Sequence, residues 1–147
     1  MRRRALLPGL LACGWPAARA VEADEAVVVV GPASPVQQLS RSQAVGVFTG
    51  RLRSWPSGEA IQALDLPPGN PARERFYRLL TGLSPAQMNS YWARLAFSGQ
   101  MQPPLVVDSE AALIRRLREQ PQGIGYLGRA PDDDRLRVLL TLRPAGA

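Results

Sequence analysis

The feature that most restricts the fold is an uninterrupted apolar run. Ala26–Val30 reads Ala-Val-Val-Val-Val and is followed directly by Gly31-Pro32. Valine favours extended backbone, and a continuous apolar run is typical of a strand that is buried on both faces. The run therefore predicts a central strand in a sheet with helices on both sides, as found in parallel sheets.

The chain also contains four signatures of helix starts. In each, a serine or asparagine precedes helix-forming residues, so its side chain can accept a hydrogen bond from an otherwise unpaired amide. Two of the four carry a glutamine three positions later, which completes a capping box. The predicted caps are Ser40, Asn70, Ser84 and Ser109.

The third of these helices has the clearest apolar face. Met88, Tyr91, Trp92 and Leu95 recur at the spacing of one helical face. We expect this face to pack in the core. Trp55 lies in a turn instead, which makes it the better aromatic candidate for recognition.

Further strands are predicted at residues 61–66, 105–107 and 123–127. Apolar residues alternate with polar ones over residues 136–142, which is typical of a one-sided edge strand. The resulting order, β-α-β-α-α-β-α-β-β, predicts an α/β fold with a mixed, mostly parallel sheet flanked by helices.

The first twenty residues have the pattern of a secretory signal peptide. Three arginines precede a short apolar stretch, and Ala18-Arg19-Ala20 supplies a cleavage pattern. We therefore expect residues 1–20 to be a signal peptide, residues 21–147 to be one domain, and the mature protein to be periplasmic or secreted. A lipoprotein anchored at Cys13 is the alternative. No later segment is apolar for long enough to span a membrane.

Charge gives no reason to expect a nucleic-acid partner. The net charge of the whole chain is +6, but residues 1–20 hold four arginines and no acid. The remainder holds 14 arginines against 12 acids, a net charge of +2. These arginines are scattered along the chain rather than gathered in one stripe.

The absence of two residue types argues against an enzyme. The chain has no histidine and no lysine, which excludes nucleophile pairs with a histidine or lysine base and Schiff-base chemistry. We expect no catalytic residues, no cofactor and no metal. The acidic run at residues 132–134 lacks the spacing of a calcium-binding loop.

Three stretches resemble one known family. Residues 39–51, followed by Trp55, are similar to the family's "helix, Ile-Phe-x-Gly-Lys/Arg, Trp" segment, and residues 61–80 to its strand, phosphate loop and helix. Gly123–Leu127 is similar to its Gly-Ala-Ile-Gly-Tyr-Val strand. The family is that of the solute-binding proteins of ABC phosphate importers, in the type 2 periplasmic-binding superfamily. The resemblance implies the fold of one lobe of a two-lobed receptor.

The resemblance also indicates where a ligand would bind. The family's phosphate loop reads approximately Arg-x-Asp-Gly-Ser-Gly-Thr, and laid without gaps on residues 66–72 only its first glycine is kept, as Gly69. Asn70 and Arg73, at a helix start, are the candidate anion ligands, together with Ser34 in the loop after the first strand. The alternatives are an ordinary helix cap with a solvated arginine, and a turn serine.

Two functions remain open at this point. The first is non-enzymatic recognition of a small anion such as phosphate by an exported, solute-binding-like protein. The second is an extracytoplasmic interaction or sensory module that has lost phosphate binding, with an envelope protein or transporter as partner. Homodimerisation that rebuilds a two-lobed cleft is a third possibility.

Overall fold

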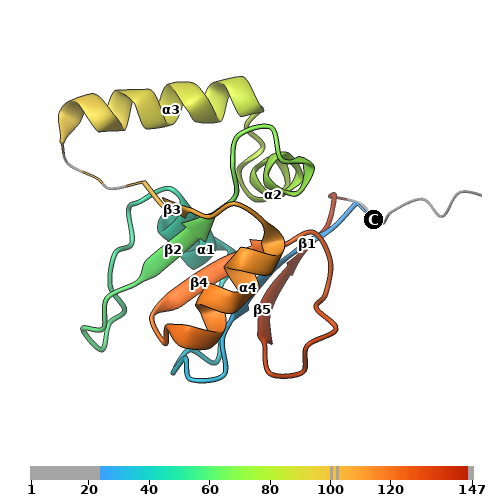
Figure 1. Ribbon diagram of the computed structural model, residues 1–147. Helices are drawn as coiled ribbons and strands as arrows, with labels where there is room; N and C mark the ends of the chain where they lie inside the picture. The colour runs from blue at the N-terminus through green and yellow to red at the C-terminus, as the bar shows by residue number, and fades with distance from the viewer. Residues whose placement is uncertain (1–23, 100, 102, 146–147) are drawn as a thin grey trace, which may run out of the picture.

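The computed structural model describes residues 24–145 except 100 and 102, and it contains the nine predicted elements in the predicted order (Figure 1). The proposed signal peptide and Cys13 lie outside the described residues. No helix in the described part of the chain is long and apolar enough to cross a membrane. The strands are β1 (Ala26–Val30), β2 (Gln62–Asp65), β3 (Leu105–Val106), β4 (Gly123–Leu127) and β5 (Arg137–Leu142), and the helices are α1 (Arg41–Phe48), α2 (Pro71–Thr81), α3 (Pro85–Ser98) and α4 (Glu110–Glu119).

The five strands form one mixed sheet in the order β3-β2-β4-β1-β5. β2 runs parallel to both β3 and β4, whereas β1 runs antiparallel to both β4 and β5. The predicted class, a mixed α/β sheet with flanking helices, is confirmed, and β5 is an edge strand as expected. Parallel and antiparallel pairs are equal in number, so the sheet is less parallel than predicted.

β1 shows why its direction was misjudged. All five of its residues are buried, as the apolar run predicts. Burial on both faces requires only that helices or loops cover the sheet, and the run of valines carries no information about the direction of its neighbours. The sequence therefore predicted the depth of β1 correctly but not its antiparallel pairing.

The helices cover the two faces of the sheet unequally. On one face, α4 lies against β4, and a Cβ atom placed on Gly125 would come within 2.7 Å of the Leu113 side chain. On the other face, Tyr126 of the same strand packs edge-on against Phe48 of α1 and stacks on Phe76 of α2. Glycine on the first side admits α4 closely, and the aromatic rings on the second side bring α1 and α2 together.

All four predicted helix caps are confirmed. Ser40 and Ser84 form complete capping boxes with their glutamines, and Asn70 and Ser109 each accept a hydrogen bond from a backbone amide of the first turn. Local polar side chains satisfy the helix ends here without help from the tertiary structure, which is why these starts are readable in the sequence.

The predicted burial of α3 is confirmed only in part. Met88 alone among its described side chains is fully buried, Tyr91 and Trp92 pack against the core from partly exposed positions, and Phe97 is 95% exposed. In Figure 1, α3 extends beyond the rest of the molecule and lies beside α2 only near its start. Its apolar stripe has too little tertiary surface to pack against.

Candidate functional site at the carboxyl end of β2

The polar site of this protein lies where β2 ends. Asp65 closes the strand, and a short turn then leads to Asn70, the cap of α2. Gly69 in this turn has a φ of +88°, a conformation that glycine adopts without strain. The carboxyl ends of strands in open α/β sheets are where ligands commonly bind, so this edge is the expected place for a site.

Four donors converge on the carboxylate of Asp65. Oδ1 accepts hydrogen bonds from the Leu66 amide at 2.8 Å and from the Tyr126 hydroxyl. Oδ2 accepts from the Tyr77 hydroxyl at 3.0 Å and from Nε of Arg73 at 3.4 Å. All of the side chains in this cluster are buried, with Asp65 3% and Arg73 5% exposed. We call these five residues the Asp65 cluster.

Three elements bring the Asp65 cluster together. Arg73 and Tyr77 are four residues apart on α2 and therefore share one helical face, with the Arg73 guanidinium 5.2 Å from the Tyr77 ring centre. Tyr126 comes from β4, which pairs in parallel with β2. Phe76 stacks on the Tyr126 ring at 3.9 Å and holds it in place.

Burial fixes the protonation of the two hydroxyl donors. It raises the pKa of Tyr77 well above the usual value, and the charge of Asp65 raises it further. The pKa of Tyr126 is raised for the same two reasons, with burial the larger. Both hydroxyls therefore remain protonated and keep donating to the carboxylate through the physiological range.

The structure does not bring the four predicted ligand residues together. Gly69, Asn70 and Arg73 lie at the carboxyl end of β2, but Ser34 follows β1, which runs the opposite way. Ser34 is therefore at the other end of the sheet, where it is buried and its hydroxyl oxygen accepts a hydrogen bond from the Val36 amide at 3.3 Å.

Each predicted ligand residue at the start of α2 already has an intramolecular role. The side-chain oxygen of Asn70 accepts the Ala72 amide at 2.9 Å, which makes it a helix cap. Arg73 is neither a solvated arginine nor directed at an open site, because it pairs with Asp65 in the interior. A carboxylate of the protein itself thus holds the arginine that was proposed to bind an anion.

Asp65 and the two tyrosines were not among the predicted site residues. A single acid at the end of the strand, directly after Ala63 and Leu64, was the available signal, together with Arg73 and Tyr77 at helical spacing. Tyr126 lies 61 residues from Asp65 along the chain, so only the sheet pairing reveals its contribution.

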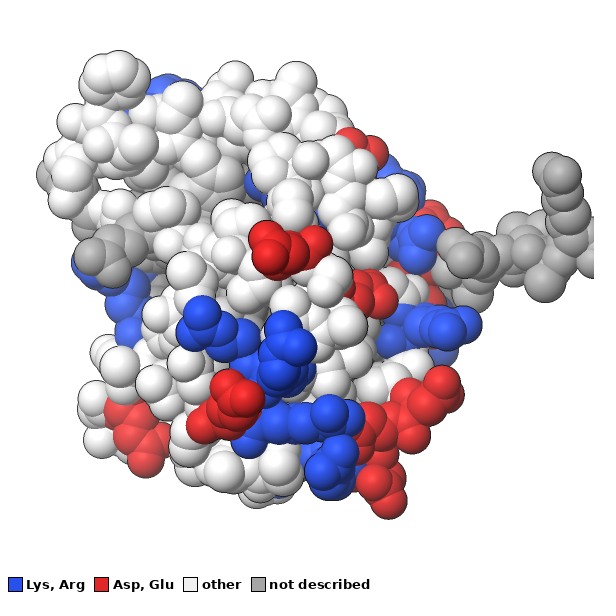
Figure 2. All heavy atoms as spheres, in the orientation of Figure 1, with Lys and Arg blue, Asp and Glu red and all other residues white. Residues whose placement is uncertain are grey.

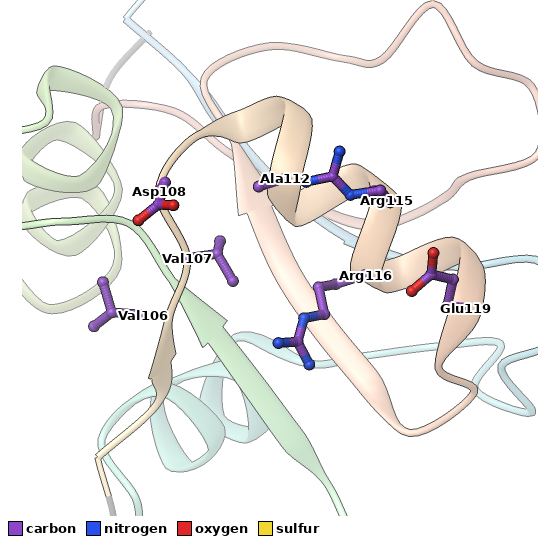
Figure 3. A pocket seen from close by; sticks show the side chains of 7 residues that line it. All are labelled: Val106, Val107, Asp108, Ala112, Arg115, Arg116 and Glu119. Carbon is purple, nitrogen blue, oxygen red and sulfur yellow. The ribbon is translucent and has the colours of Figure 1, made fainter.

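Open concavities lie elsewhere on the surface. A concavity of about 220 Å³ lies between β3 and α4, with Val107 on one side and Arg116 on the other (Figure 3). The negative charges of Asp108 and Glu119 offset the positive charges of the two arginines that line this concavity. Figure 2 shows acidic and basic side chains interspersed over α4. A larger hollow of about 480 Å³ lies next to Ser34 and is lined by Ala33, Pro35, Trp55, Glu59, Ala60, Pro121 and Gln122.

Comparison with known proteins identifies the fold. No family model and no curated protein matches the sequence. Among solved structures, an ABC-type phosphate transport receptor from Vibrio cholerae matches 78% of this chain with a TM-score of 0.60 and 20% identity. A putative phosphate ABC transporter substrate-binding protein with bound phosphate, from Clostridium perfringens, matches the same share with a TM-score of 0.60 and 14% identity.

PstS from Borrelia burgdorferi matches 69% of the chain with a TM-score of 0.51 and 14% identity. The matched regions are 44%, 43% and 39% of the three receptors, so this chain spans less than half the length of each. The resemblance noted in the sequence is thereby confirmed at the level of the fold: the chain has the fold of one lobe of a phosphate substrate-binding protein. The first two neighbours are described as a receptor and a substrate-binding protein, not as enzymes.

Proposed function

We propose that this protein is an exported, non-enzymatic recognition domain with a phosphate-receptor fold, which binds a protein partner and has lost the phosphate site. One observation carries the proposal. Of the four large hydrophobic side chains that are exposed in the described part of the chain, three lie between residues 97 and 106. They are Phe97, Leu105 and Val106, with exposed fractions of 95%, 39% and 53%. We call these three residues, which follow one another from the end of α3 to β3, the α3–β3 surface.

The composition of α3 supports a protein partner. Arg94 is the single charged residue between Pro85 and Ser98, and in Figure 2 the surface over α3 is almost free of charged side chains. Depletion of charge together with exposed aromatic side chains is typical of the centre of a protein–protein interface. Leu105 and Val106 are adjacent and both exposed, and contiguous exposed apolar side chains mark interaction sites more often than single scattered ones do.

The contacts at the start of α2 support the loss of phosphate binding. The polar groups that would meet an anion there are engaged, Asn70 with the helix backbone and Arg73 with Asp65. A phosphate would have to displace the Asp65 carboxylate from a buried ion pair, and the two like charges would repel each other.

Site-specific cross-linking tests the partner. A photoreactive amino acid is placed at Phe97 or Val106 in cells that produce the full chain, with Val138 of β5 as the matched control. Val138 is as exposed as Leu105, at 39%, but lies on the other edge of the sheet. We expect one heavier adduct from Phe97 and Val106 and none from Val138. Equal labelling at all three positions, or labelling at none, contradicts the proposal. An adduct with the mass of two copies of this chain would show that the surface binds a second copy of the protein instead of a different partner.

A small anion such as phosphate remains the second candidate. The observation that favours it is the match to a substrate-binding protein that holds phosphate, together with the ability of a helix start such as that of α2 to attract anions. Titration calorimetry of the protein with phosphate, sulfate and small carboxylates tests it. Saturable heat at millimolar phosphate or below supports this candidate, and the absence of heat removes it.

Export is part of the proposal and has its own test. The arginines before a short apolar stretch and the Ala18-Arg19-Ala20 pattern support cleavage near Ala20. Mass determination of the protein recovered from the envelope fraction gives the mature N-terminus. A mass that begins at Val21 fits a soluble exported protein, a lipidated Cys13 fits an anchored one, and an intact Met1 contradicts export.

A further inference from the structure

The Asp65 cluster has the layout of an anion-binding site that is already filled. An amide, two tyrosine hydroxyls and a guanidinium surround a single carboxylate at the edge of the sheet where ligands bind. Each carboxylate oxygen accepts two of these hydrogen bonds. Among the described side chains, no buried nitrogen or oxygen lacks a hydrogen-bond partner.

The donors come from positions that differ in how far they can move. The Leu66 amide belongs to the chain directly after β2, and it also donates to the Tyr126 hydroxyl oxygen at 3.1 Å. Tyr126 is fixed by its stacking on Phe76, and Tyr77 is 2% exposed on α2. Removal of the carboxylate would therefore leave several oriented donors in place rather than let them collapse on one another.

We propose that Asp65 is a built-in ligand: its carboxylate permanently occupies an oxyanion cradle formed by Leu66, Arg73, Tyr77 and Tyr126. The cradle itself suits a small monocarboxylate. Asp65 occupies the cradle whether or not a partner is bound at the α3–β3 surface, because the cradle and that surface share no residue.

Charge gives the cradle its selectivity. The guanidinium of Arg73 is 5% exposed, and a buried cation is stable only with an anionic or well-hydrogen-bonded partner. A neutral occupant of the same shape, such as an asparagine amide, can accept hydrogen bonds with its oxygen alone. Its NH₂ group would face Nε–H of Arg73, which is a donor and cannot accept, so that hydrogen bond and the neutralising charge would both be lost. The cradle therefore favours an anion with two accepting oxygens.

The test is to empty the cradle and supply the anion from solution. Asp65→Ala removes the carboxylate and leaves space for formate, while Asp65→Asn fills the space without the charge. Melting temperatures are measured for the native protein and both variants in up to about 100 mM sodium formate, acetate, phosphate or chloride. If formate binds the Asp65→Ala protein with a dissociation constant of about 10 mM, its folding equilibrium constant rises about 10-fold at 100 mM.

We expect formate to raise the melting temperature of Asp65→Ala by roughly 5 °C, on the scale by which about 1.4 kcal/mol stabilises a domain of this size. Acetate should act more weakly because its methyl group does not fit, and phosphate, which is larger and tetrahedral, more weakly still. The native protein and Asp65→Asn should shift no more in formate than in chloride. Equal shifts of all three proteins in formate, or an Asp65→Ala protein as stable as the native one without any anion, overturn the proposal.

A double variant covers the case in which Asp65→Ala does not fold alone. Asp65→Ala/Arg73→Met removes both charges of the pair, so it should fold better than the single variant. Its melting temperature should not depend on formate. The refolding yield of Asp65→Ala is then measured against formate concentration. A yield that rises with formate supports the built-in ligand. A yield that stays at zero in formate while the double variant folds contradicts it.

Discussion

α2 and α3 begin and end with the same local sequence signals but differ in how deeply they are buried. Each starts at a capping side chain followed by proline, and each ends at a glycine with a positive φ, of 76° for Gly82 and 65° for Gly99. Yet five side chains of α2 are buried and only one described side chain of α3 is, namely Met88. The comparison teaches that caps and stops specify where a helix lies along the chain, whereas its depth depends on the surface that meets it.

The difference divides the molecule into a closed part and an open part. α2 lies against the sheet and completes the Asp65 cluster, so its polar groups are used inside the protein (Figure 1). α3 leaves a partly apolar surface exposed, with Arg94 as its single charged residue. A site that binds from solution is therefore expected on α3 rather than at the start of α2.

The largest expected effect comes from the same substitution made on both helices. Arg73→Met leaves the buried Asp65 carboxylate without its cation and should lower the free energy of unfolding by about 3–5 kcal/mol. Arg94→Met on α3 changes an exposed side chain and should lower it by less than about 0.5 kcal/mol. Urea denaturation of both variants measures the two changes in the free energy of unfolding. Similar decreases for the two variants would contradict the conclusion that α2 is the buried helix and α3 the exposed one.

A second pair of variants compares two tyrosine hydroxyls. Tyr77 donates to the Asp65 carboxylate at 3.0 Å, and Tyr91 of α3 donates to the Thr49 carbonyl at 2.7 Å. Because a charged acceptor strengthens a hydrogen bond, Tyr77→Phe should cost about 1.5–3 kcal/mol and Tyr91→Phe about 0.5–1.5 kcal/mol. The midpoints of urea denaturation test this order, provided that the dependence of the unfolding free energy on urea concentration is the same for both variants. The reverse order would mean that the Asp65 cluster contributes less than the contact of α3 with the end of α1.

The third prediction uses pH to probe the same contrast. Burial raises the pKa of Tyr77 and Tyr126 in the folded state, so their contribution to stability is complete below the unfolded value of about 10 and is lost as the pH rises above it. Each tyrosine should lower the free energy of unfolding by roughly 0.7 kcal/mol between pH 9.5 and 10.5. Tyr77→Phe should flatten this slope by half, since one of the two groups is then missing. A slope that is unchanged in Tyr77→Phe contradicts the assignment.

The smallest expected effect on stability is at the tip of α3. Phe97→Ser removes a side chain that is 95% exposed, so the free energy of unfolding should change by less than about 0.5 kcal/mol. The same variant should weaken cross-linking from Val106 to the partner. Loss of stability without loss of cross-linking would indicate that Phe97 packs within the molecule and does not contact a partner.

The sequence predicted what local physics determines. The buried run of valines, the four caps and the alternation of strands and helices depend on neighbours in the chain, and each of these predictions is confirmed. The direction of β1 and the depth of α3 depend on segments far away in sequence; the first was not predicted, and the second was predicted only in part. Local patterns report periodicity and capping, but they do not report which surface an element meets.

The candidate site was predictable only in part. Asn70 caps α2 and Gly69 turns the chain into it, as their sequence suggests. The partner of Arg73 was not predictable, because the turn between β2 and α2 brings Asp65 to it. Tyr126 in turn reaches Asp65 only through the pairing of β4 with β2. Ser34 was placed with the others only because it follows a strand, and the antiparallel direction of β1 carries it to the opposite end of the sheet.

One measurement on the native protein tests the filled cradle most directly. Backbone amide NMR signals of Leu66, Asn70 and Ala72 are followed while phosphate is added to about 20 mM at constant ionic strength, a concentration that would saturate a site of millimolar affinity. The Leu66 amide already donates to Asp65, the Asn70 amide to the Pro67 carbonyl and the Ala72 amide to the Asn70 side chain. We therefore predict that these three signals move no more than amides of the distant strand β5. A saturable shift confined to these three signals would show that the site is open to phosphate and that Asp65 does not fill it.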